Sequence, residues 1–169
     1  GTEARSASEF ANAVESLGAN IQASAGNNTS IISSFCLKPD LRTVLALAAE
    51  ALRAPTFREE ALDQAREVQR ADLREALEDP LKTAFRILRA KLFGAQNYGL
   101  PRLGTEESLA EMTRDSLLAH HHEFVTRSNG VLAVFGDIDP DAIADHCEEL
   151  FAGLPEGVRP TASAEGAGQ

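Results

Sequence analysis

Two short segments near the amino end of the chain are predicted strands, and the first of them has the alternating pattern of a sheet. In residues 19–25, apolar side chains occupy the odd positions, which is the period of two expected of a half-buried strand. The turn residues Gly26, Asn27 and Asn28 then lead into a second strand at residues 30–37. The sequence therefore predicts a β-hairpin.

The rest of the chain reads mainly as helix, because its apolar residues recur at intervals of three and four. Ser6 and Glu9 have the spacing of a capping box. Pro80 is expected to begin a helix, and Thr105 and Thr113 are expected to cap two more. An apolar run at residues 130–135 has the length of a strand. The main helices are expected at about residues 6–17, 40–53, 58–77, 80–92, 113–125 and 140–151.

The composition fits one globular domain of the α/β (α+β) class. The chain has 169 residues, of which 43% are apolar and 25% charged, and a domain of this length buries roughly 70% of its unfolded surface. We expect this domain to span residues 1–154. Residues 155–169 are rich in Gly, Ala, Pro and Glu, which predicts a flexible linker or tail.

The net charge of −10 excludes some classes of partner. A nucleic-acid backbone is held by clusters of Lys and Arg, and this acidic chain has no such cluster. No apolar stretch approaches the roughly 20 residues of a membrane span, so a soluble protein of the cytoplasm or periplasm is expected. Cys36 and Cys147 lack metal-ligand spacing and are expected to be small buried residues, although a disulfide between them stays open.

The run His120-His121-His122-Glu123 is the first candidate for chemistry. Two histidines four residues apart on a helix can share one zinc ion, but position 124 is Phe, and adjacent histidines point around the helix. His121 and Glu123 have the spacing of a zinc deaminase, but the Pro-Cys-x-x-Cys partner is missing. We therefore expect a solvated helix face. Nucleophile elbows and phosphate loops are also missing, so no catalytic residue is assigned.

The expected helix at residues 58–77 carries many carboxylates interleaved with Arg66, Arg70 and Arg74. Most of these charges are expected to lie on a solvated helix face, where carboxylates and arginines three or four residues apart form ion pairs. Asp72 is the exception, because it follows Leu62, Ala65 and Val68 at helical spacing and so shares their expected apolar stripe. A buried carboxylate needs an ionic partner or a metal, which makes Asp72 a marginal metal candidate.

A series of segments in fixed order resembles the first domain of a lobe in the pitrilysin/insulinase family, which includes the mitochondrial processing peptidases. The resemblance covers nearly all of residues 1–155. Its segments are Gly1-Thr2, Val14 to Ala19, Ala54 to Phe57, Glu78-Asp79-Pro80, Tyr98 to Pro101, Leu103 to Leu109, Thr113-x-Asp115, Asn129 and Val134 to Asp139.

The resemblance implies an α/β fold with a mostly antiparallel sheet, in which two lobes close around an unfolded peptide. In active lobes of this family, a His-x-x-Glu-His helix supplies two zinc ligands and the general base, and it ends just before the Gly-Thr matched by Gly1 and Thr2. A later helix supplies a third ligand, a Glu, at the position of Asp72. A supporting Glu stands at the position of Ala65.

Both departures point to a lobe whose zinc site has lapsed, because Asp is one methylene shorter than Glu and Ala offers no carboxylate. The resemblance thus implies a non-catalytic lobe that encloses and positions peptide. No metal or cofactor is expected in this chain; zinc would sit in an active partner lobe, on the same chain or in a heterodimer subunit. By edge pairing, the first strand could bind an extended peptide through Asn20, Ile21, Gln22, Ala23 and Ser24.

Two alternatives remain. The first alternative to the non-catalytic lobe is a truncated active zinc metalloendopeptidase lobe with Asp72 as a metal ligand. The second is a structural assembly subunit of the same fold, like the core subunits of a respiratory complex.

Overall fold

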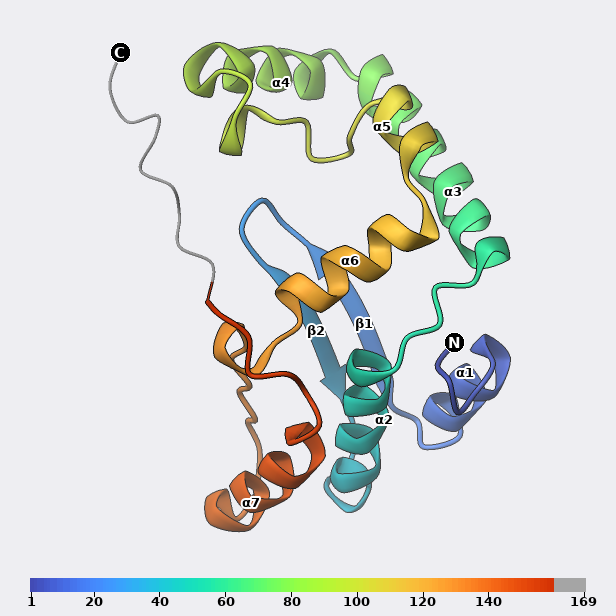
Figure 1. Cartoon of the computed structure of the whole chain (residues 1–169), viewed down its shortest axis with the longest axis vertical. Coiled ribbons are helices and arrows are strands. Elements are labelled where there is room, and N and C mark those ends of the chain that lie inside the picture. The colour runs from blue at the N-terminus through green and yellow to red at the C-terminus, as the bar shows by residue number, and fades with distance from the viewer. Residues whose placement is uncertain (160–169) are drawn as a thin grey trace. The chain divides into compact units, whose positions relative to one another are not determined.

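The structure is a computed structural model that describes residues 1–159, and it contains seven α-helices in that range together with one β-hairpin (Figure 1). The strands are β1 (Asn20–Ala25) and β2 (Ser30–Phe35), which pair with each other as a two-stranded antiparallel sheet. The predicted mixed fold with an antiparallel sheet is therefore confirmed. By their contacts, residues 1–21, 34–56 and 118–159 form one compact unit, and residues 22–33 and 57–117 form a second.

The first unit is built on α2 (Leu41–Arg53), whose inward face provides most of the buried core. Val44 is fully buried there, and the amphipathic spacing of its neighbours is the one that the sequence predicts. The helices α1 (Ala7–Glu15) and α7 (Pro140–Phe151) both pack on α2. The buried residues of α2 are Val44, Leu45, Leu47, Ala48 and Ala49.

The amino-terminal residues of the same unit are fixed against the end of α2. Thr2 forms an antiparallel bridge with Pro55, and the carbonyl oxygen of Gly1 accepts a hydrogen bond from the Thr56 amide at 3.2 Å. The Thr2 hydroxyl and the Arg5 guanidinium both bind the carboxylate of Glu50. Thr2 is only 7% exposed, so its polar side chain is buried with a partner, as buried hydroxyls require.

The helix boundaries follow local signals in the sequence. Ser6 and Glu9 form the predicted capping box of α1, with the Ser6 amide 2.8 Å from a Glu9 carboxylate oxygen. Asp79 caps α4 (Pro80–Phe93) by accepting hydrogen bonds from the amides of Leu81 and Lys82, at 2.8 and 3.1 Å.

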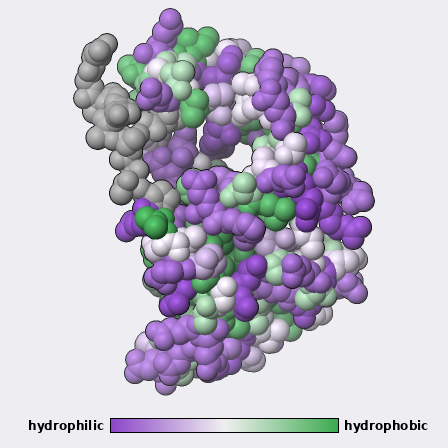
Figure 2. Space-filling view, viewed as in Figure 1, coloured by the Kyte–Doolittle hydropathy of each residue, from purple (hydrophilic) through white to green (hydrophobic). Residues whose placement is uncertain are grey.

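The second unit contains α3 (Glu59–Glu78), α4 and α5 (Glu106–Glu111), and the start of α6 (Arg114–Phe124). Thr105 caps α5, and Thr113 binds the Ser116 amide at the start of α6, as predicted. α4 is exposed along most of its length, including its large apolar residues. On the face drawn in Figure 2, hydrophilic residues predominate and apolar residues form separate patches.

Two sequence expectations about elements are wrong. The apolar run at residues 130–135 forms no strand, because no described segment pairs with it. The hairpin is also far from half-buried, since every residue of β2 is exposed and only Ile21 of β1 is partly covered. Cys36 and Cys147 are free and partly buried, so they form no disulfide. No helix of the described residues is long and apolar enough to cross a membrane.

Candidate functional site

The helix α3 carries both positions at which the family resemblance departs from an active lobe. Asp72 and Ala65 are exposed and lie seven residues apart, which is two helical turns, on one face of α3. The expectation that Asp72 lies on a buried apolar stripe is wrong. Val68, between them in sequence, is 63% exposed, whereas Leu62 and Leu73 are the buried residues of α3.

The physical reason is that arginine and glutamine side chains occupy the covered face of α3. Arg66 and Gln69 lie between Leu62 and Leu73 at helical spacing, and the side chain of Arg66 is only 19% exposed. A long arginine can bury its methylenes while its guanidinium reaches polar groups, so a charged residue need not face water. The buried face of α3 is therefore rotated away from the stripe that apolar spacing predicts.

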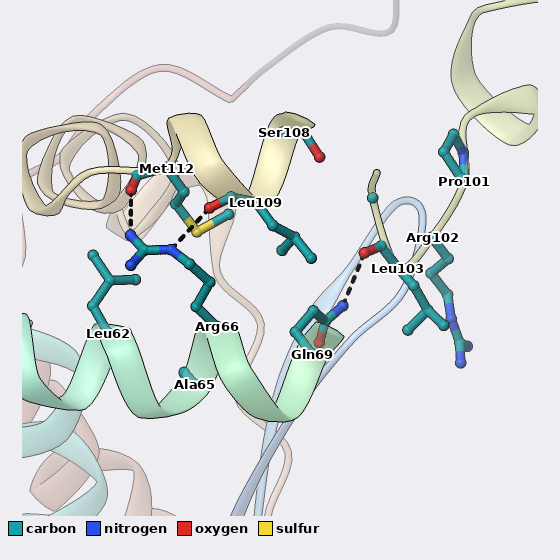
Figure 3. Close-up of a pocket in the computed structure, with 11 residues that line it drawn as sticks. Leu62, Ala65, Arg66, Gln69, Pro101, Arg102, Leu103, Ser108, Leu109 and Met112 are labelled. Atoms are coloured by element: carbon teal, nitrogen blue, oxygen red, sulfur yellow. Dashed lines mark hydrogen bonds between the residues drawn. The ribbon is translucent and has the colours of Figure 1, made fainter. Parts of the chain in front are cut away.

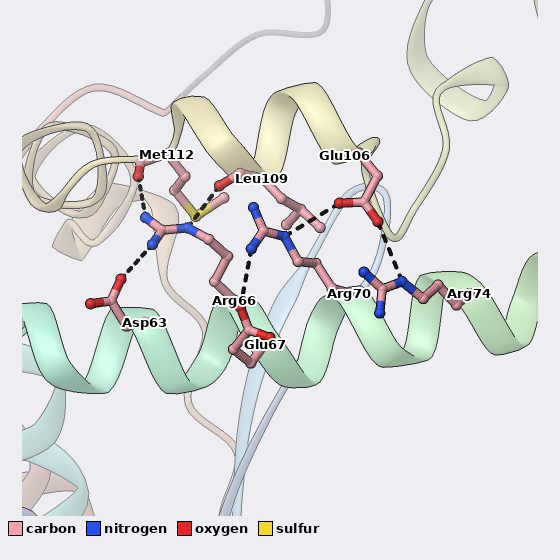
Figure 4. Close-up of polar contacts among 8 residues, drawn as sticks. All are labelled: Asp63, Arg66, Glu67, Arg70, Arg74, Glu106, Leu109 and Met112. Carbon is pink, nitrogen blue, oxygen red and sulfur yellow. Dashed lines mark hydrogen bonds and ion pairs between the residues drawn. The ribbon is translucent and has the colours of Figure 1, made fainter.

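Arg66 holds the carboxyl end of α5 against α3 (Figure 4). Its Nε donates to the carbonyl oxygen of Leu109 at 2.9 Å, and its Nη2 donates to the carbonyl oxygen of Met112 at 2.8 Å. The last carbonyls of a helix have no partner within the helix, so one arginine here satisfies two groups that otherwise need water. Asp63, one turn earlier on α3, binds the same guanidinium.

A second set of ion pairs holds the amino end of α5 (Figure 4). Glu106 in the first turn of α5 lies 3.3 Å from Arg70 Nε and 3.8 Å from Arg74 Nε. Arg70 also pairs with Glu67 at 3.0 Å on its own helix. A carboxylate in the first turn of a helix is also stabilised by the helix dipole, so both the arginines of α3 and the dipole of α5 attract the negative charge of Glu106 at this position.

A pocket of about 430 Å³ lies between α3 and the segment from Pro101 to Met112 (Figure 3). Leu62, Ala65 and Arg66 line it from α3, and Gln69 fixes the loop by donating to the carbonyl oxygen of Leu103 at 3.2 Å. The remaining lining is mainly apolar and includes Leu103, Leu109 and Met112. Ala65 thus places a methyl group, rather than a carboxylate, at the wall of an apolar pocket.

The predicted peptide-binding residues all lie in β1. Asn20, Gln22, Ala23 and Ser24 are exposed, and Ile21 is partly covered. Within the described residues, β1 pairs only with β2, so one of its edges keeps its backbone groups available for another strand.

The histidine run on α6 forms a largely exposed helix face, since His120 and His122 are exposed. His121 is partly covered, with its Nε2 2.7 Å from the carbonyl oxygen of Leu52 on α2. The ring of His120 lies against that of Phe124, at 4.5 Å between centroids. In the part of the chain that the structure describes, no three His, Cys, Asp or Glu side chains come together as a group able to hold a metal ion.

The pocket and the arginine contacts were not predicted from the sequence. The sequence predicts a solvated face for Arg66 and Arg70, and the i,i+3 pairs Asp63–Arg66 and Glu67–Arg70 do form. The signal that distinguishes them is their position between Leu62 and Leu73 in the same helical stripe, which marks them as facing a neighbouring element.

Comparison with known proteins places these features in a family. The model for insulinase (peptidase family M16) matches residues 1–106, and the model for the peptidase M16 inactive domain matches residues 111–166. An uncharacterized zinc protease from Rickettsia bellii is 26% identical over 157 residues, which is 93% of this chain and 38% of that protein.

Solved structures agree on the fold. A peptidase M16 inactive domain from Pseudomonas fluorescens is 24% identical with a TM-score of 0.91, over 99% of this chain and 41% of that one. The first half of the periplasmic protease PqqL from Escherichia coli is 22% identical with a TM-score of 0.79, over 97% of this chain and 36% of that one. The chain therefore spans about two fifths of the length of these three proteins. Because the first family model alone covers more than half of its residues, the chain belongs to the insulinase family of peptidases, M16.

Proposed function

We propose that this chain is part of a non-catalytic lobe of an M16 zinc metallopeptidase, which encloses and positions peptide substrate for proteolysis. The observation that carries the proposal is the composition of one face of α3. Where an active lobe of the family has two glutamates, this face has a methyl group at Ala65 and a short carboxylate at Asp72, two turns apart.

The chemistry of that face supports a binding role over a hydrolytic one. A carboxylate shortened by one methylene moves its oxygens by about 1.5 Å, and displacement on that scale is costly in a catalytic zinc site. The missing second carboxylate removes a group that orients the first, and such outer groups affect metal affinity about 10- to 100-fold.

The surroundings of Ala65 support contact with a peptide. The pocket of about 430 Å³ beside it has room for one large side chain, and its wall of Leu62, Leu103 and Met112 is suited to an apolar one. The exposed edge of β1 offers main-chain hydrogen bonds to an extended peptide through Asn20 to Ser24. These two features act independently in the proposal, and each is tested on its own.

The proposal assigns zinc and the general base to a partner lobe, on the same chain or in a heterodimer subunit. The relatives named as zinc proteases are longer than this chain by more than twofold, which leaves room for such a lobe. The proposed partners are a second lobe and an unfolded peptide, and no nucleic acid is proposed. The proposed compartment is the cytoplasm or the periplasm.

Zinc titration and a peptide-cleavage assay on the complete product of the gene, with and without Asp72→Ala, test whether this lobe takes part in catalysis. We expect Asp72→Ala to leave zinc binding and cleavage unchanged, because the proposal assigns the zinc to another lobe. Loss of stoichiometric zinc and of cleavage in Asp72→Ala would instead establish the alternative, an active lobe with Asp72 as a metal ligand.

Fluorescence anisotropy with a labelled unstructured peptide tests the binding role. The variant Ala65→Phe fills the pocket and is expected to weaken binding about tenfold, while Ala71→Phe, an exposed position on α3 outside the pocket lining, leaves it unchanged. The variant Ala23→Pro removes one amide of β1 and is compared with Ala23→Ser, which keeps it. Equal affinity in all four variants refutes both binding features.

A further inference from the structure

Asn129 differs from the other asparagines of the chain in the residue that follows it. It precedes Gly130, and a glycine has no Cβ, so its backbone nitrogen can be approached closely and its conformation changes easily. An asparagine side chain therefore reaches the backbone nitrogen of the next residue most readily here. The other asparagines precede larger residues, in the pairs Asn12-Ala13, Asn20-Ile21, Asn27-Asn28, Asn28-Thr29 and Asn97-Tyr98.

The backbone around this pair leaves the Gly130 amide weakly held. Asn129 ends the short 3₁₀-helix η3 (Arg127–Asn129), and both Asn129 and Gly130 are exposed. The Gly130 amide donates to the carbonyl oxygen of Arg127 at 3.4 Å. That distance is longer than an ordinary N–H···O hydrogen bond, so this amide is available to react with a neighbouring group.

The side chain of Asn129 closes the turn that follows α6. Its Nδ2 donates to the carbonyl oxygen of Phe124 at 2.9 Å, and the same oxygen accepts a hydrogen bond from the Thr126 amide at 3.1 Å. Phe124 is the last residue of α6, and the last carbonyls of a helix have no partner within the helix. Asn129 therefore supplies a neutral donor to the carboxyl end of α6.

We propose that Asn129-Gly130 is a site of spontaneous deamidation, at which the asparagine converts to aspartate and isoaspartate without an enzyme. The nitrogen of Gly130 attacks Cγ of Asn129 and forms a bond to it. The bond from Cγ to Nδ2 then breaks, and Nδ2 leaves as ammonia together with the proton of the Gly130 amide. The product is a cyclic succinimide. This inference does not depend on the proposed function.

Water then opens the succinimide at one of its two carbonyl carbons. Attack at Cγ restores the normal main chain and leaves an aspartate. Attack at the main-chain carbonyl carbon of Asn129 leaves an isoaspartate, in which the main chain runs through Cγ and is one carbon longer. Water is the only co-reactant, and nothing is oxidised or reduced.

Either product places a negative charge where a donor stood. A carboxylate cannot donate to the carbonyl oxygen of Phe124, and the helix dipole disfavours a negative charge at the carboxyl end of α6. The next turn holds a second segment, because the amides of Arg127 and Ser128 donate to the carbonyls of Pro155 and Glu156 at 2.9 and 3.0 Å. Deamidation should therefore loosen these two hydrogen bonds.

Mass spectrometry of the complete product of the gene, incubated at neutral pH and then digested, tests the reaction. We expect the peptide containing Asn129 to gain about 1 Da, the difference between an amide and an acid, before any other asparagine of this chain reacts. Both aspartate and isoaspartate should appear, because direct hydrolysis of the side chain gives aspartate alone. A sample digested without incubation gives the background.

Two variants test the part that Gly130 plays in the reaction. Gly130→Ala should fold, because an added Cβ would lie 3.5 Å from its nearest neighbour, the carbonyl oxygen of Thr126. It is expected to slow deamidation about tenfold, since the Cβ restricts the approach of the nitrogen to Cγ. Val131→Ala, at a position that is 96% exposed, keeps the Asn-Gly pair and should leave the rate unchanged.

The structural consequence is measured separately by amide hydrogen exchange. In Asn129→Asp, the amides of Arg127 and Ser128 are expected to exchange about tenfold faster, because one hydrogen bond of the turn is replaced by a repulsive contact. Asn20→Asp adds the same charge at an exposed residue of β1 and should leave both amides unchanged.

The site is ruled out if another asparagine of this chain reacts first, if aspartate forms without isoaspartate, or if Gly130→Ala reacts as fast as the natural sequence. Unchanged exchange at Arg127 and Ser128 in Asn129→Asp contradicts the consequence assigned to the modification.

Discussion

Arg66 on α3 lies with its Nε 2.9 Å from the carbonyl oxygen of Leu109 and thereby ties α5 to α3 from a side chain that is four-fifths buried. Because the same guanidinium also reaches Met112 O, its removal leaves two helix-end carbonyls without their donor.

The first prediction follows from that contact. Arg66→Ala is expected to lower the free energy of unfolding by about 1.5–3 kcal/mol, the range for hydrogen bonds to a charged group, as measured by urea denaturation. Arg74→Ala is the matched control, because Arg74 is 70% exposed and makes one long contact of 3.8 Å. It should cost less than about 0.5 kcal/mol. Equal losses in the two variants contradict the role assigned to Arg66.

The second prediction concerns the cap of α1. The Ser6 hydroxyl, and then its amide, donate hydrogen bonds to the Glu9 carboxylate and lower the pKa of that carboxyl from its usual value. Because the pKa is lower in the folded state, this contribution to stability is present above the unfolded pKa and is lost as pH falls through the folded one. Ser6→Ala is expected to raise the pKa of Glu9 in an NMR titration.

Ser8→Ala is the control for this titration, since Ser8 lies within α1 and is exposed. It should leave the Glu9 titration unchanged. In addition, Ser6→Ala should cost about 1 kcal/mol of stability at neutral pH through loss of the cap itself. An unshifted Glu9 titration in Ser6→Ala is the outcome that rules the mechanism out.

The third prediction contrasts two leucines of the first unit. Leu47 on α2 is 4% exposed and Leu37 is 64% exposed. Leu47→Ala is expected to cost about 2–5 kcal/mol, because it removes buried methyl groups and leaves a cavity. Leu37→Ala is expected to change stability by less than about 1 kcal/mol. Thermal denaturation of both variants checks the order, and a larger loss at Leu37 means that this side chain is buried in solution.

The fourth prediction concerns the thiols. Burial raises the pKa of Cys147, and burial together with the charge of Asp40 raises the pKa of Cys36. Since only the thiolate reacts, alkylation of both at pH 7.5 should be slower than for a free cysteine and should accelerate with rising pH. Asp40→Asn should speed the reaction of Cys36 alone. Mass spectrometry after iodoacetamide treatment resolves the two sites, and a rate equal to that of the urea-unfolded chain contradicts the prediction.

The sequence predicts what is local and misses what depends on distant partners. The capping box at Ser6, the helix start at Pro80 and the cap at Thr105 are encoded within a few residues, and all three are confirmed. The strand at residues 130–135 has the right composition but no neighbour in the described residues, because pairing is a property of two segments.

The site was predicted less well than the fold. Apolar spacing assigned Ala65, Val68 and Asp72 to the buried face of α3, whereas Arg66 and Gln69 lie there. A prediction from apolar spacing counts arginine as exposed. It therefore misses a covered helix face, such as that of α3, in which the arginine methylenes are buried and the guanidinium binds polar groups. The position of Asp72 relative to Ala65 was nevertheless correct, since helical geometry alone fixes two residues seven apart on one side.

The seam between α3 and α5 consists mostly of guanidinium–carbonyl and guanidinium–carboxylate contacts, with Leu109 as the only buried apolar residue of α5. Separating the two helices exposes few buried apolar side chains, chiefly Leu62 and Leu109, so this step should have a smaller heat capacity and a weaker dependence on urea than unfolding of the whole chain. Its charged contacts are screened by salt. The population in which α5 is separated from α3 should therefore depend more on the sodium chloride concentration than on the denaturant concentration.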